Sequence, residues 1–475
     1  MRICSLMLII SITWSCNAGT PTTVPGPVTV CTTDMSDLVL LKITDSLTWK
    51  ASGARTREDS LVIEVDTSRT YQQINGFGAA LTGSAAYVLH NYVNPLSRDS
   101  LFRQLFTPAG IGLDFLRVSI GPSDFSPHNF AYPFQLFPDS TLTLNLAEDT
   151  LHVLPILREI LSINPALKII ASPWSAPASF KSNKQLEGGS LLPAYESLYA
   201  RYLTGYLQAM QRAGIRIYAL TPVSAPLAGE QAYPSMSLGA VQARRLVKNF
   251  LGPYLKASGS DARLMVYDGN LDGAEYADSL LDEKTVSQYV SGVAFHGYAG
   301  SVSNMSLVKK LHPEMEVVLT EISGGESTPV FGDNLRLYVR HMLIGGMRNW
   351  ASGILFYNLA LNEHHGPQNN GCKDCRGVIT VYSKTGQTIR TEEYFALGHF
   401  GKFVRPGAYR VFSTEMPAHQ IYNVAFYREG QYTVVVMNEA RHAQRVSVVS
   451  EAHIFSYTLP SEAVVTFSWK SGAGK

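Results

Sequence analysis

The sequence Val317–Gly325, VVLTEISGG, decides how the rest of the chain is organised. Its first four residues are apolar or β-branched, which is typical of a buried strand, and the two final glycines break that strand. Glu321 therefore lies at the carboxyl end of the strand. In a barrel of parallel strands that end carries the catalytic residues, and a carboxylate there suits a nucleophile or a general base. Its position alone is equally consistent with an acid that caps a helix or pairs with an arginine.

Eight short apolar runs alternate with longer helix-like segments through the middle of the chain. The runs are Ile74–Leu81, Phe115–Gly121, Lys168–Pro177, Ile217–Pro226, Arg263–Asn270, Gly292–Tyr298, Val317–Gly325 and Gly353–Leu361. Strands that alternate with helices pair in parallel. Eight such units predict an α/β fold, a (β/α)8 TIM barrel over residues 71–404.

After residue 405 the apolar period changes to two. The expected strands there are Ile421–Arg428, Gln431–Met437, Arg445–Val449 and Ala463–Trp469. This alternation is typical of antiparallel strands with one buried face. Short apolar pieces at 36–70 have no place in the barrel. We therefore expect segments 36–70 and 405–475 to form one discontinuous antiparallel β-sandwich side domain.

The N-terminus is typical of an export signal. Residues 1–16 combine Arg2, an apolar run at Ile3–Ile12 and a small residue before Cys16. Cys16 is the expected lipidation site, and residues 17–35, rich in Thr, Pro, Gly and Val, are expected to form a flexible tether. The predicted location is the outer membrane or surface of a bacterium, with membrane contact only through the lipid.

The composition limits the classes of partner. The chain has 475 residues, a formal net charge of +1 and 45% hydrophobic residues. A near-neutral chain without a basic stripe does not indicate a nucleic-acid partner. The 24 Tyr and 20 Phe suit stacking on carbohydrate, but they equally suit large cores. The sequence implies no metal or organic cofactor, and it does not predict an oligomeric state.

Two of the cysteines form a C-x-x-C motif, Cys372 and Cys375. In an exported protein this motif predicts a local disulfide that closes a loop. The alternative is a metal site completed by His364 and His365, although no second C-x-x-C is present. Cys31 is left over, either free or paired between chains.

Polar and aromatic residues gather at equivalent ends of the predicted barrel strands. They are Arg117, Asp124, Trp174, Asp268, Asn270, His296, Tyr298, Glu321, Tyr357 and Asn358. Each has a structural explanation by itself; Arg117, for example, could simply pair with Glu321. Because the carboxyl ends of barrel strands meet at one face, their joint occurrence predicts a shared pocket.

With these motifs the chain resembles glycoside hydrolase family 30, the family of glucosylceramidases and of bacterial and fungal β-glucanases. The matching segments are Ile74–Gly83, Leu116–Val118, Ser123–Ser126, Ala171–Pro177, Phe295–Tyr298, Thr320–Glu321, Asn358–Leu361, Gly371–Gly377 and Leu397–Phe403. The resemblance covers residues 32–470. It implies a β-linked glucoside or glucan as substrate and a retaining mechanism with two carboxylates about 5–5.5 Å apart.

By this resemblance Glu321 is the nucleophile. The residues implied to bind the sugar or to surround the nucleophile are Arg117, Asp124, Trp174, Ser224, His296, Tyr298 and Asn358. The sequence departs from the family at the end of strand four, where the family has Asn-Glu-Pro and this chain has Ser224-Ala225-Pro226. Ala225 thus replaces the acid/base. A second departure is Gly269, where related bacterial members often carry His between Asp and Asn.

General acid catalysis contributes about 10²- to 10⁴-fold to such reactions. The first hypothesis is therefore a family member that binds natural substrates but turns them over poorly or not at all. The second is an active β-glucosidase, β-glucanase or glucosylceramidase with a displaced acid, for which Glu230 in the following loop is the candidate. The third is a surface adhesion or structural lipoprotein, against which the retained pocket residues argue.

Overall fold

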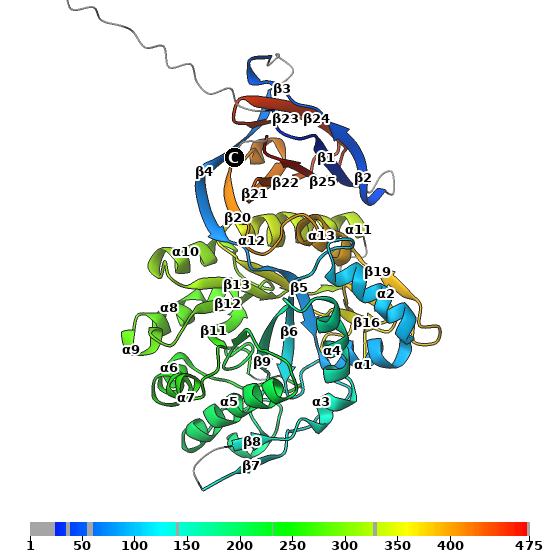
Figure 1. Cartoon of the computed structure of the whole chain (residues 1–475). Helices are drawn as coiled ribbons and strands as arrows, with labels where there is room; N and C mark the ends of the chain where they lie inside the picture. The colour runs from blue at the N-terminus through cyan, green and yellow to red at the C-terminus, as the bar shows by residue number, and fades with distance from the viewer. Residues whose placement is uncertain are drawn as a thin grey trace, which may run out of the picture.

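The computed structural model describes residues 24–34, 39–54, 60–138, 142–229, 231–325 and 330–472. Figure 1 shows a strand barrel surrounded by helices and, beside it, a domain made of strands. The expected signal peptide and Cys16 lie outside the described residues. No helix within the described ranges is long and apolar enough to cross a membrane.

The eight predicted parallel strands close into a barrel, which confirms the TIM-barrel prediction. In chain order they are β5 Gly76–Leu81, β6 Phe115–Ile120, β9 Lys168–Pro173, β10 Ala219–Leu220, β11 Arg263–Asn270, β12 Gly292–His296, β13 Glu316–Glu321 and β15 Gly353–Phe356. One layer of buried apolar residues fills the barrel. Its members are Phe115, Ile170, Ala219, Met265, Ala294, Val318 and Leu355.

Helices cover the outside of the barrel (Figure 1). They are α1 Gly83–Tyr92, α2 Pro95–Phe106, α3 Ala147–Leu151, α4 Val153–Ile163, α5 Glu196–Arg212, α6 Ala240–Leu246, α7 Gly252–Ala257, α8 Ala274–Leu281, α9 Lys284–Ser287, α10 Ser303–Leu311, α11 Phe331–Arg336, α12 Gly345–Arg348 and α13 Glu392–Gly401. In α5, Tyr199, Tyr202 and Tyr206 share the buried face because they recur at helical spacing. The helix ends where Gly214 takes a φ of 83°.

Ten strands form the side domain as one curled sheet. They are β1 Val28–Asp34, β2 Val39–Leu47, β3 Lys50–Ala51, β4 Leu61–Gln73, β20 Tyr409–Ser413, β21 Ile421–Arg428, β22 Gln431–Asn438, β23 Gln444–Ser450, β24 His453–Leu459 and β25 Ala463–Lys470. β1 lies between β2 and β25, and β4 lies between β20 and β23. Strands from both ends of the chain therefore build one domain, as predicted. The pairing is antiparallel except for β4 with β23, which is parallel.

The predicted tether over 17–35 is wrong at its C-terminal end. Residues Val28–Asp34 form β1, and all but one of them are buried. The segment is rich in β-branched residues, which favour a pleated, half-buried surface. The tether prediction extended into this segment because Pro25, Gly26 and Pro27 precede it.

His399 of α13 joins the barrel to the sheet. Its Nδ1 lies 2.8 Å from Thr466 Oγ1 of β25, and its Nε2 lies 2.8 Å from Thr33 Oγ1 of β1. The imidazole is fully buried, and this burial lowers its pKa from 6.5 to about 3. The two halves of the discontinuous domain thus meet on one neutral histidine.

Candidate active site

A polar layer lies directly above the apolar filling of the barrel, toward the carboxyl ends of the strands. Residues two positions apart on a strand face the same side, so the layer continues the inward-facing series. Its members are Arg117, Ser172, Thr221, His296 and Thr320, two residues beyond the filling, and Asp268, three residues beyond it. The step from apolar to polar marks the floor of the predicted pocket.

Arg117 is the centre of this layer. Its guanidinium donates to Ser172 Oγ at 3.2 Å, to Ser224 Oγ at 2.9 Å, to Asp268 Oδ2 at 2.9 Å and to Glu321 Oε2. The side chain is fully buried. A buried guanidinium is stable only with such partners, and here it holds two carboxylates in fixed positions.

Asp268 reaches the layer through a bulge in β11. The pairing of β11 with β12 slips between Tyr267 and Gly269. Tyr267 and Asp268 both have positive φ, 74° and 61°, which non-glycine residues rarely adopt. The extra residue turns the Asp268 carboxylate into the barrel instead of outward.

Four groups surround the Asp268 carboxylate. Besides Arg117, Thr221 Oγ1 donates at 2.8 Å and Thr320 Oγ1 at 2.6 Å, and His296 Nε2 lies 3.1 Å away. Burial disfavours the charge, but Arg117, His296 and Thr320 outweigh it and hold the pKa of Asp268 well below its usual range. Asp268 is thus a permanent anion that fixes Arg117 and His296.

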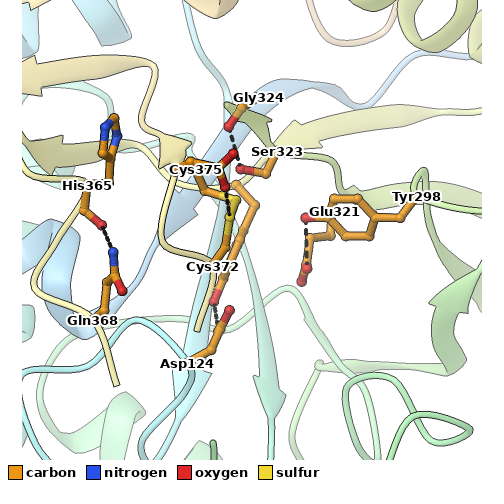
Figure 2. The surroundings of a disulfide bond; sticks show 11 residues. Asp124, Tyr298, Glu321, Ser323, Gly324, His365, Gln368, Cys372 and Cys375 are labelled. Atoms are coloured by element: carbon orange, nitrogen blue, oxygen red, sulfur yellow. Dashed lines mark hydrogen bonds between the residues drawn. A yellow bond between two sulfur atoms is a disulfide. The ribbon is translucent and has the colours of Figure 1, made fainter. Parts of the chain in front are cut away.

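Glu321 stands at the end of β13 with both carboxylate oxygens engaged. Arg117 donates to Oε2, and Tyr298 Oη donates to Oε1 at 3.1 Å. His296 Nε2 lies 3.8 Å from Oε2. The strand register places His296 directly beside Glu321, because the two pair across β12 and β13. Figure 2 shows Tyr298 reaching over Glu321.

An aromatic wall lies on the side of Asp124. Trp174 stacks on Tyr357 with ring centroids 5.9 Å apart and an interplanar angle of 21°, and Tyr357 Oη donates to Asp124 Oδ1. The guanidinium carbon of Arg117 lies 4.5 Å from the centre of the Trp174 ring. Burial, and secondarily the charge of Glu321, raise the pKa of Asp124 to about 7.

Asn358 presents a free donor to the same wall. Its Oδ1 accepts a bond of 2.7 Å from Thr82 Oγ1, whereas its buried Nδ2 has no acceptor among the described residues. A buried polar group without a partner is costly. A hydroxyl group of a bound ligand would satisfy Nδ2.

Ala225 takes the place at the end of the fourth barrel strand that the resemblance assigns to the acid/base. It has a φ of 50°, and its backbone N–H donates to Asp268 O at 2.7 Å. Its methyl group carries no proton to transfer. It lines a cavity of about 410 Å³ together with Leu227, Ala228, Tyr267, Gly269, Asn270, Asp272 and Gly273. Glu230, the expected substitute, lies outside the described residues.

Cys372 and Cys375 form a disulfide, with an S–S distance of 2.05 Å (Figure 2). Disulfide sulfurs do not act as thiolate ligands, so the alternative metal site with His364 and His365 loses two of its four groups. Cys31 is a buried free cysteine in β1, and burial raises the pKa of its thiol to about 12.

The structure brings most of the predicted site residues together. Arg117, Ser224, His296, Tyr298 and Glu321 form one hydrogen-bonded or ion-paired network. Asp124, Trp174 and Asn358 lie along its aromatic side. The sequence prediction missed Ser172, Thr221 and Thr320 as parts of the network. The sequence feature that could have identified them is their position two residues after a buried apolar residue of the same predicted barrel strand.

The comparisons with known proteins agree with this geometry. Residues 74–404 match the domain described as "Glycosyl hydrolase family 30 TIM-barrel domain", and residues 407–467 match "Glycosyl hydrolase family 30 beta sandwich domain". The endo-1,6-beta-D-glucanase neg1 of Aspergillus fumigatus is 30% identical over 435 residues, which cover 85% of this chain and 86% of the relative. The endo-1,6-beta-D-glucanase of Neurospora crassa is 31% identical over 364 residues, 73% of this chain and 74% of the relative.

Among solved structures, the endo-beta1,6-glucanase BT3312 superposes with a TM-score of 0.84 at 29% sequence identity. The match covers 94% of this chain and 100% of that one. The lysosomal acid glucosylceramidase of Mus musculus is a further relative, 26% identical over 437 residues. On the match of both domains and of these relatives along most of its length, the chain belongs to glycosyl hydrolase family 30.

Proposed function

We propose that this protein is a retaining glycosidase that cleaves β-linked glucose residues with Glu321 as its nucleophile. The observation that carries the proposal is the set of contacts to Glu321. Arg117 and Tyr298 donate to its two oxygens, and these bonds hold the carboxylate in place at the end of β13, where it can attack an anomeric carbon. Asp124, Trp174 and Asn358 supply an acceptor, an apolar face and a free donor for the sugar.

The proposed substrate is a β-1,6-linked glucan. Support comes from the relatives from Aspergillus fumigatus and Neurospora crassa and from the solved structure, all three of which are named as endo-1,6-glucanases. A β-glucosyl lipid of the glucosylceramide type is the runner-up, because a glucosylceramidase also matches over 86% of this chain.

In this proposal the leaving group receives its proton from a displaced acid. Ala225 supplies none, and Asp268 is fixed as an anion by Arg117. Glu230 follows Ala225 in the same loop and is the acid we assign to this step. The hydrolase names of the relatives favour an active enzyme over an inactive one.

A second candidate function is glycan binding with little or no turnover. One observation favours it, the alanine at position 225. Without a proton donor, the loss is greatest for poor leaving groups such as sugar alcohols, because these depend most on protonation. An intermediate on Glu321 would also lack a base to activate water.

The experiment combines intact-mass spectrometry with product release from 2,4-dinitrophenyl β-glucoside, with and without azide. This leaving group needs little protonation, and azide is small enough to enter the space beside Ala225. The proposed nucleophile predicts a glucosyl adduct on the wild type and none on Glu321→Gln. Absence of any adduct, burst or steady product release on the wild type would refute the catalytic proposal.

The same assay separates the two candidate functions. Steady hydrolysis of β-1,6-glucan without azide, lost in Glu230→Gln but kept in the exposed-acid control Glu275→Gln, supports the displaced acid. A persistent adduct that only azide releases as β-glucosyl azide supports binding with little turnover.

We further propose that the protein is exported and lipid-anchored through Cys16, from the pattern of residues 1–16. Expression in a bacterium with labelled palmitate tests this. The full chain should carry label in the membrane fraction, and Cys16→Ala should abolish it. Label-free wild type would refute the anchor.

A further inference from the structure

The C-x-x-C loop packs against the aromatic wall of the pocket. The buried cluster of Ala80, Phe125, Trp174, Tyr357 and Leu361 has Cys372 and Cys375 packed on it. Trp174 and Tyr357 are the stacked aromatic pair described above. Figure 2 shows the disulfide sulfurs between Asp124 and Gly324, three residues after Glu321. The disulfide therefore touches the side of the pocket that would hold the glycone.

One flank of the loop is fixed to Asp124. The backbone N–H of Asn369 donates to Asp124 O at 2.8 Å, and Asn369 Nδ2 donates to Ser123 O at 3.0 Å. Gly371 lies so close that a Cβ there would come within 2.8 Å of both Asp124 Cβ and Asp124 O. The backbone position of Asp124 thus depends on where this flank lies.

The other flank is fixed to the segment after Glu321. Cys375–Arg376 forms strand β17, which pairs with β14, Gly324–Gly325. A Cβ on Gly325 would lie 2.9 Å from Asp374 O. Within β17, the Arg376 guanidinium lies 3.2 Å from Glu392 Oε2 and 3.5 Å from Glu393 Oε1 of α13. Asp124 follows β6 and Glu321 ends β13, two strands that are not neighbours in the barrel, and the loop contacts the segments next to both.

From these contacts we propose that the Cys372–Cys375 disulfide is a positioning element for the glycone site. It holds the two flanks at a fixed separation, and through them it sets the place of Asp124 relative to Glu321. The inference rests on the proposed function, since it assumes that this pocket binds a β-glucosyl unit. The cysteines are positioning residues, because they act through Asp124 and the aromatic pair.

The sequence separation of the two cysteines is 3, so the bond restrains only a short ring. In the chain-entropy account, the contribution of a disulfide to global stability grows with the length of the loop it closes. Loss of this bond should therefore change ligand affinity more than it changes overall stability. That difference separates a positioning role from a merely structural one.

The test measures binding of 1-deoxynojirimycin, a glucose-shaped amine, by calorimetry on the full chain before and after dithiothreitol. The reagent's two thiols form its cyclic disulfide, and Cys372 and Cys375 each become a thiol. We expect Kd to rise about tenfold on reduction while Tm moves by less than ~2 °C. Removal of the reductant and reoxidation should restore the affinity.

Two variants serve as controls. Cys372→Ser/Cys375→Ser should bind 1-deoxynojirimycin with the affinity of the reduced wild type, and dithiothreitol should not change that affinity. Lys373→Ala, an exposed position inside the ring, should keep both the disulfide and the affinity. Equal affinity in the oxidised and reduced states would overturn the inference and leave the proposed function standing. No binding in either state would overturn both.

Discussion

Arg117 and Asp268 form an ion pair of 2.9 Å in which neither side chain is exposed to solvent. The pair comes from β6 and β11, which are not neighbours in the barrel. It joins two separated parts of the barrel wall, and Arg117 also donates to Glu321. The polar floor of the pocket therefore contributes to the stability of the barrel as well as to its chemistry.

Asp268→Asn should strongly destabilise the protein. The change leaves a buried guanidinium with one carboxylate fewer, and breaking a buried ion pair costs about 3–5 kcal/mol. Urea unfolding at neutral pH measures the free energy. Asp261→Asn is the matched control, since its pair with Arg216 is exposed and should cost less than ~1 kcal/mol. Similar values for both variants would contradict the central role of the pair.

On the second candidate function, glycan binding with little turnover, Ala225→Glu should raise the rate of β-1,6-glucan hydrolysis by about 10²-fold or more, because it returns a proton donor to the segment after β10. With Glu230 as a working acid the rate should change little. Ala225 is itself a non-glycine residue with a φ of 50°, so a longer side chain there adds no new backbone strain. Reducing-sugar release measures the rate. Ala228→Glu places a carboxylate in the same cavity three residues later and should have no such effect. An unchanged rate in Ala225→Glu would mean that the wild type does not lack its acid.

Affinity for gentiobiose should fall as the pH drops through about 7. The pKa of Asp124 lies near this value, and the ionised carboxylate accepts hydrogen bonds from sugar hydroxyls through both oxygens, whereas protonation turns one oxygen into a donor. Calorimetry between pH 5.5 and pH 8 on the wild type should show a severalfold change. In Asp124→Asn the affinity should be weaker and independent of pH over this range. A wild-type profile as flat as that of the variant would contradict the prediction.

Protonation of His399 should weaken the fold in acid. Its pKa is about 3 when folded and 6.5 when exposed, so below pH 6.5 the unfolded chain binds a proton that the folded one excludes. The stability it contributes is complete above pH 6.5 and is lost as the pH falls toward 3. Between pH 7 and pH 5 the loss is about 2 kcal/mol.

Urea unfolding at both pH values measures this loss, and His399→Gln provides the reference. The amide keeps a donor and an acceptor for Thr33 and Thr466 but does not titrate. The variant should lose about 2 kcal/mol less than the wild type over this interval. Equal losses would show that His399 does not govern the acid sensitivity.

The barrel was predictable because each apolar run fixes both a strand and its place in the alternation. The polar layer was only partly predictable. Ser172, Thr221 and Thr320 each follow a residue of the buried apolar layer by two positions on the same predicted strand. The strand period alone therefore predicts that they face into the barrel. Asp268 is out of phase, because it follows a bulge, and a bulge depends on the neighbouring strand as well as on local sequence.

The strand β1 was missed for a different reason. Its residues favour a strand, but pairing partners decide whether such a short segment folds. Those partners are β2 nearby and β25 at the far end of the chain. A contact across more than 400 residues leaves no local mark on the sequence.

The placement of β25 between β1 and β22 also sets the order of events during synthesis. A ribosome delivers β1 and β4 before the barrel and β25 after it. Until then β1 offers an unpaired edge, which is a site for association with other chains. Loss of β25 through a premature stop would leave the barrel sequence intact and still expose this edge. A strand made after the barrel thus determines whether one made before it stays soluble.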